Sequence, residues 1–237
     1  MDKGKENNVW RYLRSADVNG FASKIMTLLL IVFCVSCGNS KDNKRTERQA
    51  LKSWTQKERV YLVDELRRIQ TDLQVEVDQL SVEQWLFKPD TGAWSISEVV
   101  EHLEMHDVLF RREITVLTQF PEMTNLSHLA TDTDEELMTY SQITSQNTAK
   151  SLWYLEPRGR WSSREQAIDA FNQVRNEMIR FIEETDKDFR RYYSPSGKGN
   201  ADFRDLHQLM LISVAHADRH LTQIRNIKGH AGFPESK

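Results

Sequence analysis

The chain has 237 residues, a formal net charge of −3 and 39% hydrophobic residues, a composition ordinary for a soluble globular protein. That length holds one good-sized domain or two small ones. The near-neutral charge, without a long run of Lys and Arg or a Gly-rich phosphate loop, gives no reason to expect a nucleic-acid partner.

The N-terminal segment has the pattern of a secretory signal peptide. An apolar run of eleven residues, 25–35, follows a stretch of net charge +2. A membrane-spanning helix needs roughly 20 apolar residues, so this run is too short to be one. Ser36 stands before Cys37, as at a bacterial lipoprotein processing site. We therefore predict a signal peptide over 1–36, cleavage before Cys37 and lipidation of Cys37. The alternatives are a buried N-terminal helix and a plain signal anchor.

A polar segment, 37–54, follows as a tether between the lipidated cysteine and the folded domain. Cleavage would remove Cys34 and acylation would occupy Cys37, so the mature chain would have no free thiol for catalysis, metal binding or a disulfide. Acyl chains anchor a protein to a membrane surface without spanning it. We expect an exported protein, lipid-anchored to the bacterial cell envelope at the periplasm or outer membrane.

Two amphipathic helices are predicted next. The first begins at a capping box, Thr55–Glu58, and the second at another, Ser95–Glu98. Ser81–Gln84 caps a short turn between them, before a break with Pro and Gly at 88–94. Apolar residues recur at a helical spacing of three and four: Leu62, Leu66, Ile69, Leu73, Val77 and Leu80 in the first helix, and Val99, Leu103, His106, Phe110, Ile114 and Leu117 in the second.

A long connection, 119–162, follows and is expected to hold structure of its own. Thr133–Glu136 looks like a helix start, and we predict a helix from there to about Tyr154. A third long helix begins at Ser163–Gln166.

The fourth long helix is predicted from about Asp202 to Lys228. The segment 192–200 before it is predicted to be a loop, and no β-hairpin is expected. Four amphipathic helices with one long link, between the second and the third, predict an all-α four-helix bundle over 55–234.

Histidines stand out on the predicted core faces. His216 and His220 are four residues apart on the core stripe of the last helix, so both rings leave the same face. Burying an unpaired imidazole costs a few kcal/mol, and a shared metal ion would satisfy both rings. The alternative is a pair of core histidines satisfied by hydrogen bonds. A third ligand would come from the second helix, with His102 as the better candidate and His106 as its rival.

Three neutral imidazoles suit Zn, Ni or Fe and leave positions open for water or substrate, as in catalytic metal sites. Other signatures are absent from the sequence: HExxH, the Glu-x-x-His pattern of di-iron bundles, and GxSxG. Glu98 is assigned to its capping box rather than to catalysis. Arg219 and Gln223, each three residues after a proposed ligand, are candidates to orient those ligands from behind. No catalytic base is identified.

Four segments together resemble the DinB-like superfamily of four-helix metalloproteins, which includes the YfiT-type proteins. They are LSVEQWLFKPDTGAWSISEVVEHL (80–103), LEPRGRW (155–161), FNQVRNEMIRFIE (171–183) and LMLISVAHADRHLTQIRNIKGHAGFP (209–234).

The resemblance covers about 56–234. It implies one divalent metal ion held by a second-helix histidine and a last-helix HxxxH pair, which fall on His102, His216 and His220. It also implies a bundle with a buried site, in many members a homodimer, and either thiol-dependent S-transferase or metal-dependent hydrolase activity. An exported protein has less access to a small-thiol cofactor, which counts against the transferase.

We therefore expect a metal-dependent enzyme at the cell envelope that acts on a small molecule. Two alternatives remain open at this point. One is a non-enzymatic bundle lipoprotein that binds a metal or a ligand, and the other is a structural bundle without metal.

Overall fold

A computed structural model of the chain describes residues 52–143, 152–195 and 203–235. The predicted signal peptide and nearly all of the predicted tether lie outside these residues. None of the described helices is both long and apolar enough to cross a membrane.

The described part consists of helices and one small sheet. The elements in chain order are α2 (Gln56–Val77), α3 (Val82–Leu86), α4 (Ile96–Leu117), η1 (Thr124–Leu129), α5 (Asp134–Ile143), η3 (Trp153–Leu155), α6 (Arg164–Glu184), η4 (Phe189–Arg191), β1 (Tyr193–Pro195), β2 (Phe203–Asp205) and α7 (Leu206–Lys228).

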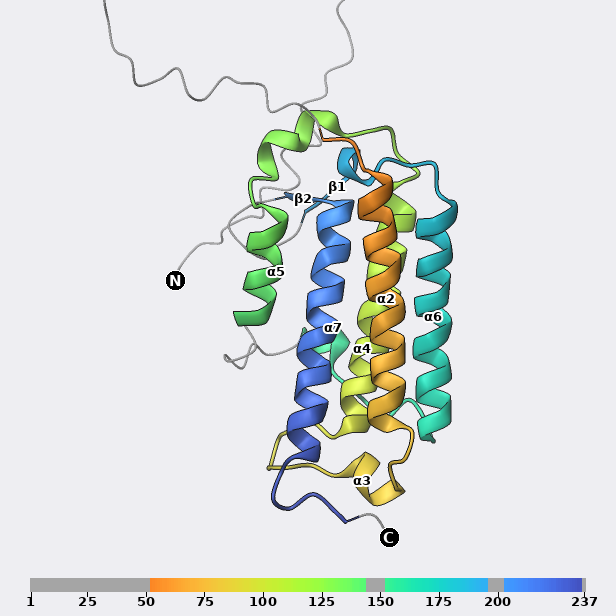
Figure 1. Cartoon of the computed structure of the whole chain (residues 1–237), viewed down its shortest axis with the longest axis vertical. Helices are drawn as coiled ribbons and strands as arrows, with labels where there is room; N and C mark the ends of the chain where they lie inside the picture. The colour runs from red at the N-terminus through yellow and green to blue at the C-terminus, as the bar shows by residue number, and fades with distance from the viewer. Residues whose placement is uncertain (1–51, 144–151, 196–202, 236–237) are drawn as a thin grey trace, which may run out of the picture. The chain divides into compact units, whose positions relative to one another are not determined.

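The four long helices, α2, α4, α6 and α7, form the predicted four-helix bundle (Figure 1). Helices α6 and α7 each pack against both α2 and α4. Helices α2 and α4 therefore lie diagonally opposite each other in the bundle, and so do α6 and α7. Consecutive long helices α2 and α4 are thus joined across the bundle, and they are not adjacent in it.

Helix direction explains the long connection between α4 and α6. In Figure 1, α4 and α6 both run upwards, whereas α2 and α7 run downwards. Parallel neighbours cannot be joined by a short loop, because the chain must return along the length of the bundle. Helix α5 lies in this return segment and packs against α7.

The predicted helix starts are confirmed. Thr55, Ser81 and Ser95 are the N-caps of α2, α3 and α4, each with a complete capping box. The predicted extent of α5 is wrong, since the helix ends at Ile143 and Trp153–Leu155 form a separate 3-10 turn. Its apolar pattern is weak, with Leu137 in the core and Met138 packed against it, and gave no signal for the end of the helix.

A short antiparallel sheet precedes α7 and corrects two predictions. Tyr193 pairs with Asp205 and Pro195 with Phe203, so 192–200 is not wholly a loop and the last helix begins at Leu206 rather than near Asp202. Strands of three residues are too short to show an alternating pattern in the sequence. Asp205 ends the strand and caps α7, accepting a hydrogen bond from the backbone N–H of Gln208 at 2.8 Å.

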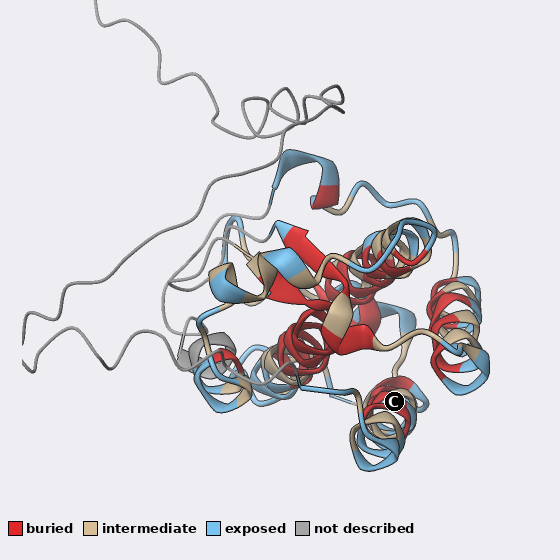
Figure 2. Ribbon diagram, turned by 90° about the horizontal axis from the view of Figure 1, so that it is seen from above, coloured by how far each residue is buried: buried red, intermediate tan, exposed pale blue. Residues whose placement is uncertain are grey.

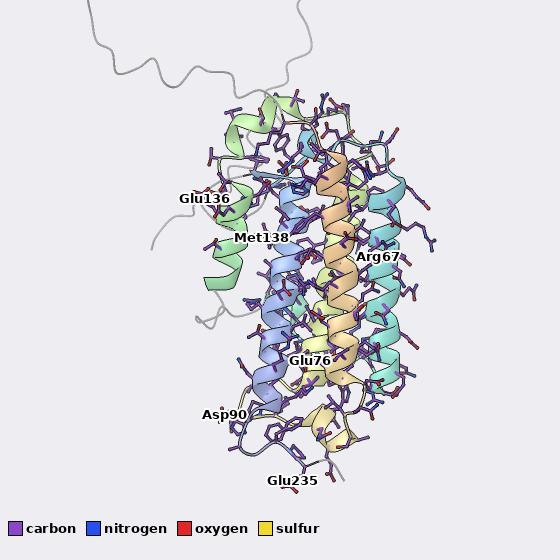
Figure 3. All side chains as sticks on the ribbon, in the orientation of Figure 1. Arg67, Glu76, Asp90, Glu136, Met138 and Glu235 are labelled. Carbon is purple, nitrogen blue, oxygen red and sulfur yellow. The ribbon has the colours of Figure 1, made fainter. Side chains whose placement is uncertain are left out.

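The predicted stripes face the bundle interior, and Figure 2 shows the buried residues on the inner faces of the helices. Ion pairs join neighbouring helices at the surface, including Arg67 with Glu183 at 2.7 Å between α2 and α6, and Glu76 with Arg225 at 2.6 Å between α2 and α7 (Figure 3).

One end of the bundle is held by an ion network around the buried Arg190. Its guanidinium binds the carboxylates of Glu58 at 2.6 Å and Asp205 at 2.9 Å, and it also binds Asp134. His207 lies beside this network and is buried, with 3% of its surface exposed. Trp54 Nε1 donates to its Nδ1 at 3.2 Å and so ties the chain before α2 to α7.

Stability in mild acid should depend on His207. Burial, then the charges of Arg190 and Lys52, lower its pKa to about 4 against the opposing effect of Asp134 and Glu58. Between about pH 6.5 and 4 the unfolded chain then binds more protons, so the free energy of unfolding falls as the pH falls. We expect His207→Gln to remove about 2–3 kcal/mol of that loss, measured by urea unfolding of chelator-treated protein at pH 7 and pH 4.

His230→Gln, which changes an exposed ring, is the matched control and should keep the pH dependence of the parent. A His207→Gln protein that loses as much stability as the parent between pH 7 and pH 4 would contradict the assignment.

Candidate metal centre

Four histidines meet where α4 crosses α7. These two helices are antiparallel neighbours (Figure 1), which brings His106 level with His216 and His102 level with His220. The ring centroids are 4.0 Å apart in the first pair and 4.8 Å apart in the second. The structure therefore brings together all three predicted ligands and also the rival, His106.

The Nε2 atoms of the predicted ligands converge. Nε2 of His216 lies 3.3 Å from Nε2 of His102 and 3.1 Å from Nε2 of His220. A tetrahedral zinc ion with Zn–N bonds of about 2.0–2.1 Å separates its ligand nitrogens by about 3.3–3.4 Å. The two spacings at His216 are close to those around a shared zinc ion. His106 also has a ring nitrogen close by, since His102, His106 and His216 each place one within 4.8 Å of the others.

The Nδ1 atoms of two rings are committed to acceptors. His102 Nδ1 lies 2.7 Å from the carbonyl oxygen of Leu155, and His220 Nδ1 lies 2.7 Å from the side-chain oxygen of Gln223. Each Nδ1 must donate its hydrogen there, because a carbonyl oxygen only accepts. In the neutral form of each ring the lone pair is then on Nε2, which is the form that binds a metal.

This tautomer assignment leaves at most one hydrogen for the two close N···N contacts of His216. His216 Nε2 faces two Nε2 lone pairs and, as a neutral imidazole, can donate to only one of them. Burial, then the charges of its neighbours, hold the pKa of His216 well below its usual range, so an extra proton is not favoured. At least one close N···N contact lacks a hydrogen, and a metal cation would relieve it.

Both side chains expected to orient the ligands contact His220. Gln223 accepts from His220 Nδ1, and the Arg219 guanidinium donates to His220 Nε2 at 3.1 Å. Glu98 serves the capping box of α4, accepting from the N–H of Ser95 at 2.8 Å, as expected. Trp94 packs its ring 4.8 Å from that of His102 and covers one side of the centre.

A loop after η3 supports His102, and Glu101 holds that loop. The Glu101 carboxylate, 2% exposed, accepts hydrogen bonds from three successive backbone N–H groups, of Arg158 (2.8 Å), Gly159 (2.9 Å) and Arg160 (3.2 Å). Gly159 has φ +70°, a conformation that favours glycine. Leu155, whose oxygen accepts from His102, is the last residue of η3 and directly precedes this loop. The sequence analysis did not identify Glu101 or Gly159 as supporting residues. The available signals were a glutamate directly before a proposed ligand histidine and the Arg-Gly-Arg sequence at 158–160.

The other carboxylates of α4 near the centre are also engaged. Glu104 binds Arg160 at 2.8 Å, and Asp107 binds Arg175 at 2.7 Å with both side chains buried. Burial raises the pKa of Asp107 to about 6 against the effect of Arg175. Each of the described α4 carboxylates near the histidines therefore already has a partner, and none of them is available as a catalytic base.

A second cluster, Glu58, Asp134 and His207, also places its ligand atoms close together. Its chemistry differs. Trp54 Nε1 donates to His207 Nδ1, so that lone pair is used and the neutral ring carries its hydrogen on Nε2. Both carboxylates already bind Arg190. This cluster is a structural ion network.

Comparison with known proteins agrees with this architecture. A family model described as the DinB superfamily matches residues 65–224. No curated protein sequence matches the chain significantly. Among solved structures, the chain is similar to YfiT from Bacillus subtilis, described as a probable metal-dependent hydrolase with an unusual four-helix bundle topology. The sequences are 16% identical, the match covers 77% of this chain and 93% of YfiT, and the TM-score is 0.52.

Replacing Glu101 should loosen the support of His102. Glu101→Gln keeps the size of the side chain but offers one accepting oxygen to three N–H groups, and we expect a loss of about 1–3 kcal/mol in the free energy of unfolding. Urea unfolding measures this loss. Glu184→Gln, on the exposed surface of α6, is the control and should change stability by less than about 0.5 kcal/mol. Equal stability of the two variants would contradict the anchoring role.

Proposed function

The chain belongs to the DinB superfamily, and we propose that His102, His216 and His220 bind one divalent metal ion. The observation that supports this ligand set is the pair of Nε2···Nε2 contacts, 3.3 and 3.1 Å, among rings whose Nδ1 atoms donate elsewhere. Imidazole nitrogens suit zinc, nickel or iron(II), and the donor set itself does not distinguish among them. His106 lies beside the site without being one of the proposed ligands.

We propose further that the site is catalytic and acts on a small molecule. When bound, a divalent ion supplies an anionic nucleophile near neutral pH by lowering the pKa of a bound water or thiol. The residues of this chain hold and orient two of the three rings, His102 through Leu155 and His220 through Gln223. Three protein ligands leave a position open, which is the arrangement of catalytic rather than structural zinc sites.

Hydrolysis is the reaction type we favour. YfiT, whose fold this chain shares, is described as a probable metal-dependent hydrolase, and water needs no cofactor. A thiol-dependent transfer is the other reaction that the superfamily resemblance implies, and it requires a small thiol that is scarce outside the cytoplasm.

One observation favours a second candidate function, a bundle that binds a metal or a ligand without turnover. The nearby carboxylates of α4 are committed to Arg160, Arg175 and the loop backbone, so no carboxylate base is evident there. Metal-loaded protein assayed against esters, amides and thiol acceptors separates the two functions. A rate that disappears with His102→Ala supports the enzyme, and no rate on any of these substrates favours the binding protein.

The ligand set is tested by metal content. We expect about one metal ion per chain in untagged protein of residues 38–237, and at least a tenfold weaker affinity in His102→Ala, His216→Ala and His220→Ala, because each removes one of three ligands. Elemental mass spectrometry after dialysis against a defined metal buffer measures both. His106→Ala is the matched control and should keep the metal. If His220→Ala keeps the metal ion and His106→Ala loses it, His106 and not His220 is the third ligand.

We also propose that the protein is exported and lipid-anchored to the cell envelope through Cys37. The support is the apolar run at 25–35 followed by Ser36 and Cys37, and the polar segment that separates them from the helix that begins at Gln56.

Anchoring should disappear when the acceptor is replaced. We expect Cys37→Ser to abolish incorporation of labelled palmitate and to move the protein out of the membrane fraction of a bacterial host, because no thiol remains there to be acylated. Cys34→Ser is the control and should leave both unchanged. Palmitate labelling that persists in Cys37→Ser would exclude this anchor.

A further inference from the structure

Arg219 is a half-buried cation at the edge of the proposed metal site. It lies on α7 directly before His220, and its guanidinium donates to His220 Nε2 at 3.1 Å. The neighbouring Asp218 does not serve it, because that carboxylate binds Arg68 of α2 at 2.9 Å. Within the described residues, no carboxylate forms an ion pair with Arg219.

The fully buried arginines of the described chain behave differently. Arg175 binds Asp107, Arg204 binds Asp132, and Arg190 binds several carboxylates. Removing a guanidinium from water without a partner of opposite charge is costly, so burial normally comes with an acid. The half-buried Arg219 bears part of this cost without an acidic partner, next to the proposed ligand His220.

Metal binding and the hydrogen bond of Arg219 use the same atom. His220 Nε2 has one lone pair, and it cannot accept from Arg219 while it binds a metal ion. In the metal-loaded protein the guanidinium needs another acceptor, and its donors then lie beside the open position of the site.

The charges around the site indicate which acceptor fits. The three imidazoles are neutral, a divalent ion adds two positive charges and Arg219 adds a third, whereas Glu104 and Asp107 are matched by Arg160 and Arg175. Glu101, whose carboxylate is held by backbone N–H groups, offsets one charge. An anion is therefore favoured at the open position and beside it. A single planar guanidinium matches the charge and the two oxygens of one carboxylate.

We propose that Arg219 is a specificity-determining residue that binds a carboxylate of the substrate beside the metal ion, so that the site accepts small carboxylic acids and their derivatives rather than neutral compounds. This inference rests on the proposed metal-binding function. It assigns to Arg219 a direct contact with substrate instead of the support of a ligand histidine that its spacing predicted.

The test uses cobalt(II)-loaded protein of residues 38–237, with acetate as the anionic probe and acetamide as its neutral analogue. The readout is the change in cobalt(II) visible absorption during titration at fixed ionic strength, which reports binding without turnover. Arg219→Gln removes the charge, and Arg219→Lys keeps it without the planar fork. Arg225→Gln is the matched control, since it changes an exposed arginine of the same helix that binds Glu76.

We expect Arg219→Gln to bind cobalt(II) at the parent stoichiometry and acetate at least tenfold more weakly, while acetamide binding stays unchanged. We expect Arg219→Lys to lie between the two and Arg225→Gln to match the parent. Equal acetate affinity in the parent and Arg219→Gln would overturn the role of Arg219 and leave the metal site standing. A parent protein that binds no cobalt(II) would overturn both proposals.

Discussion

The hydrogen-bonding capacity of neutral imidazole constrains the centre of this protein more than any other property. A neutral ring has one donor and one acceptor nitrogen. The antiparallel packing of α4 against α7 places four such rings together, three of them at most 5% exposed. Leu155 and Gln223 take the hydrogens of His102 and His220, which turns the remaining lone pairs inward. The packing of α4 against α7 brings the rings together, and the hydrogen bonds to Leu155 and Gln223 set which of their nitrogens carry lone pairs.

Bundle topology and site geometry are linked through the long connection. Because α4 and α6 run parallel, the chain between them has to return along the bundle. Its last part, the loop from η3 to α6, passes α4 and is fastened there by Glu101. The carbonyl oxygen of Leu155 then reaches His102 Nδ1. A shorter up-and-down connection would have left this face of α4 without the loop and His102 without its acceptor.

The sequence predicted what repeats along a helix and missed what depends on distant contacts. Capping boxes at Thr55, Ser81 and Ser95 set the helix starts, because a cap is a local interaction. The diagonal arrangement of α2 and α4, the strand pair at Tyr193–Asp205 and the burial of His207 arise from packing between remote segments, for which spacing gives no signal. Spacing placed His216 and His220 on one face and favoured His102 over His106, the resemblance also selected His102, and the structure brings all four rings together.

The two histidine clusters of the described chain differ in where the hydrogens on their ring nitrogens are placed. That difference decides which cluster suits a metal ion. At His207 the indole N–H of Trp54 occupies Nδ1, the nearby carboxylates bind Arg190, and every charge has a partner within the protein. Around His216 the acceptors Leu155 and Gln223 withdraw hydrogens from the centre, and the half-buried Arg219 has no acidic partner among the described residues. The first cluster satisfies itself and stabilises the fold. We propose that the second is completed by a cation among the imidazoles and an anion beside Arg219, and its unmatched hydrogen-bonding groups are the physical basis for assigning function to it.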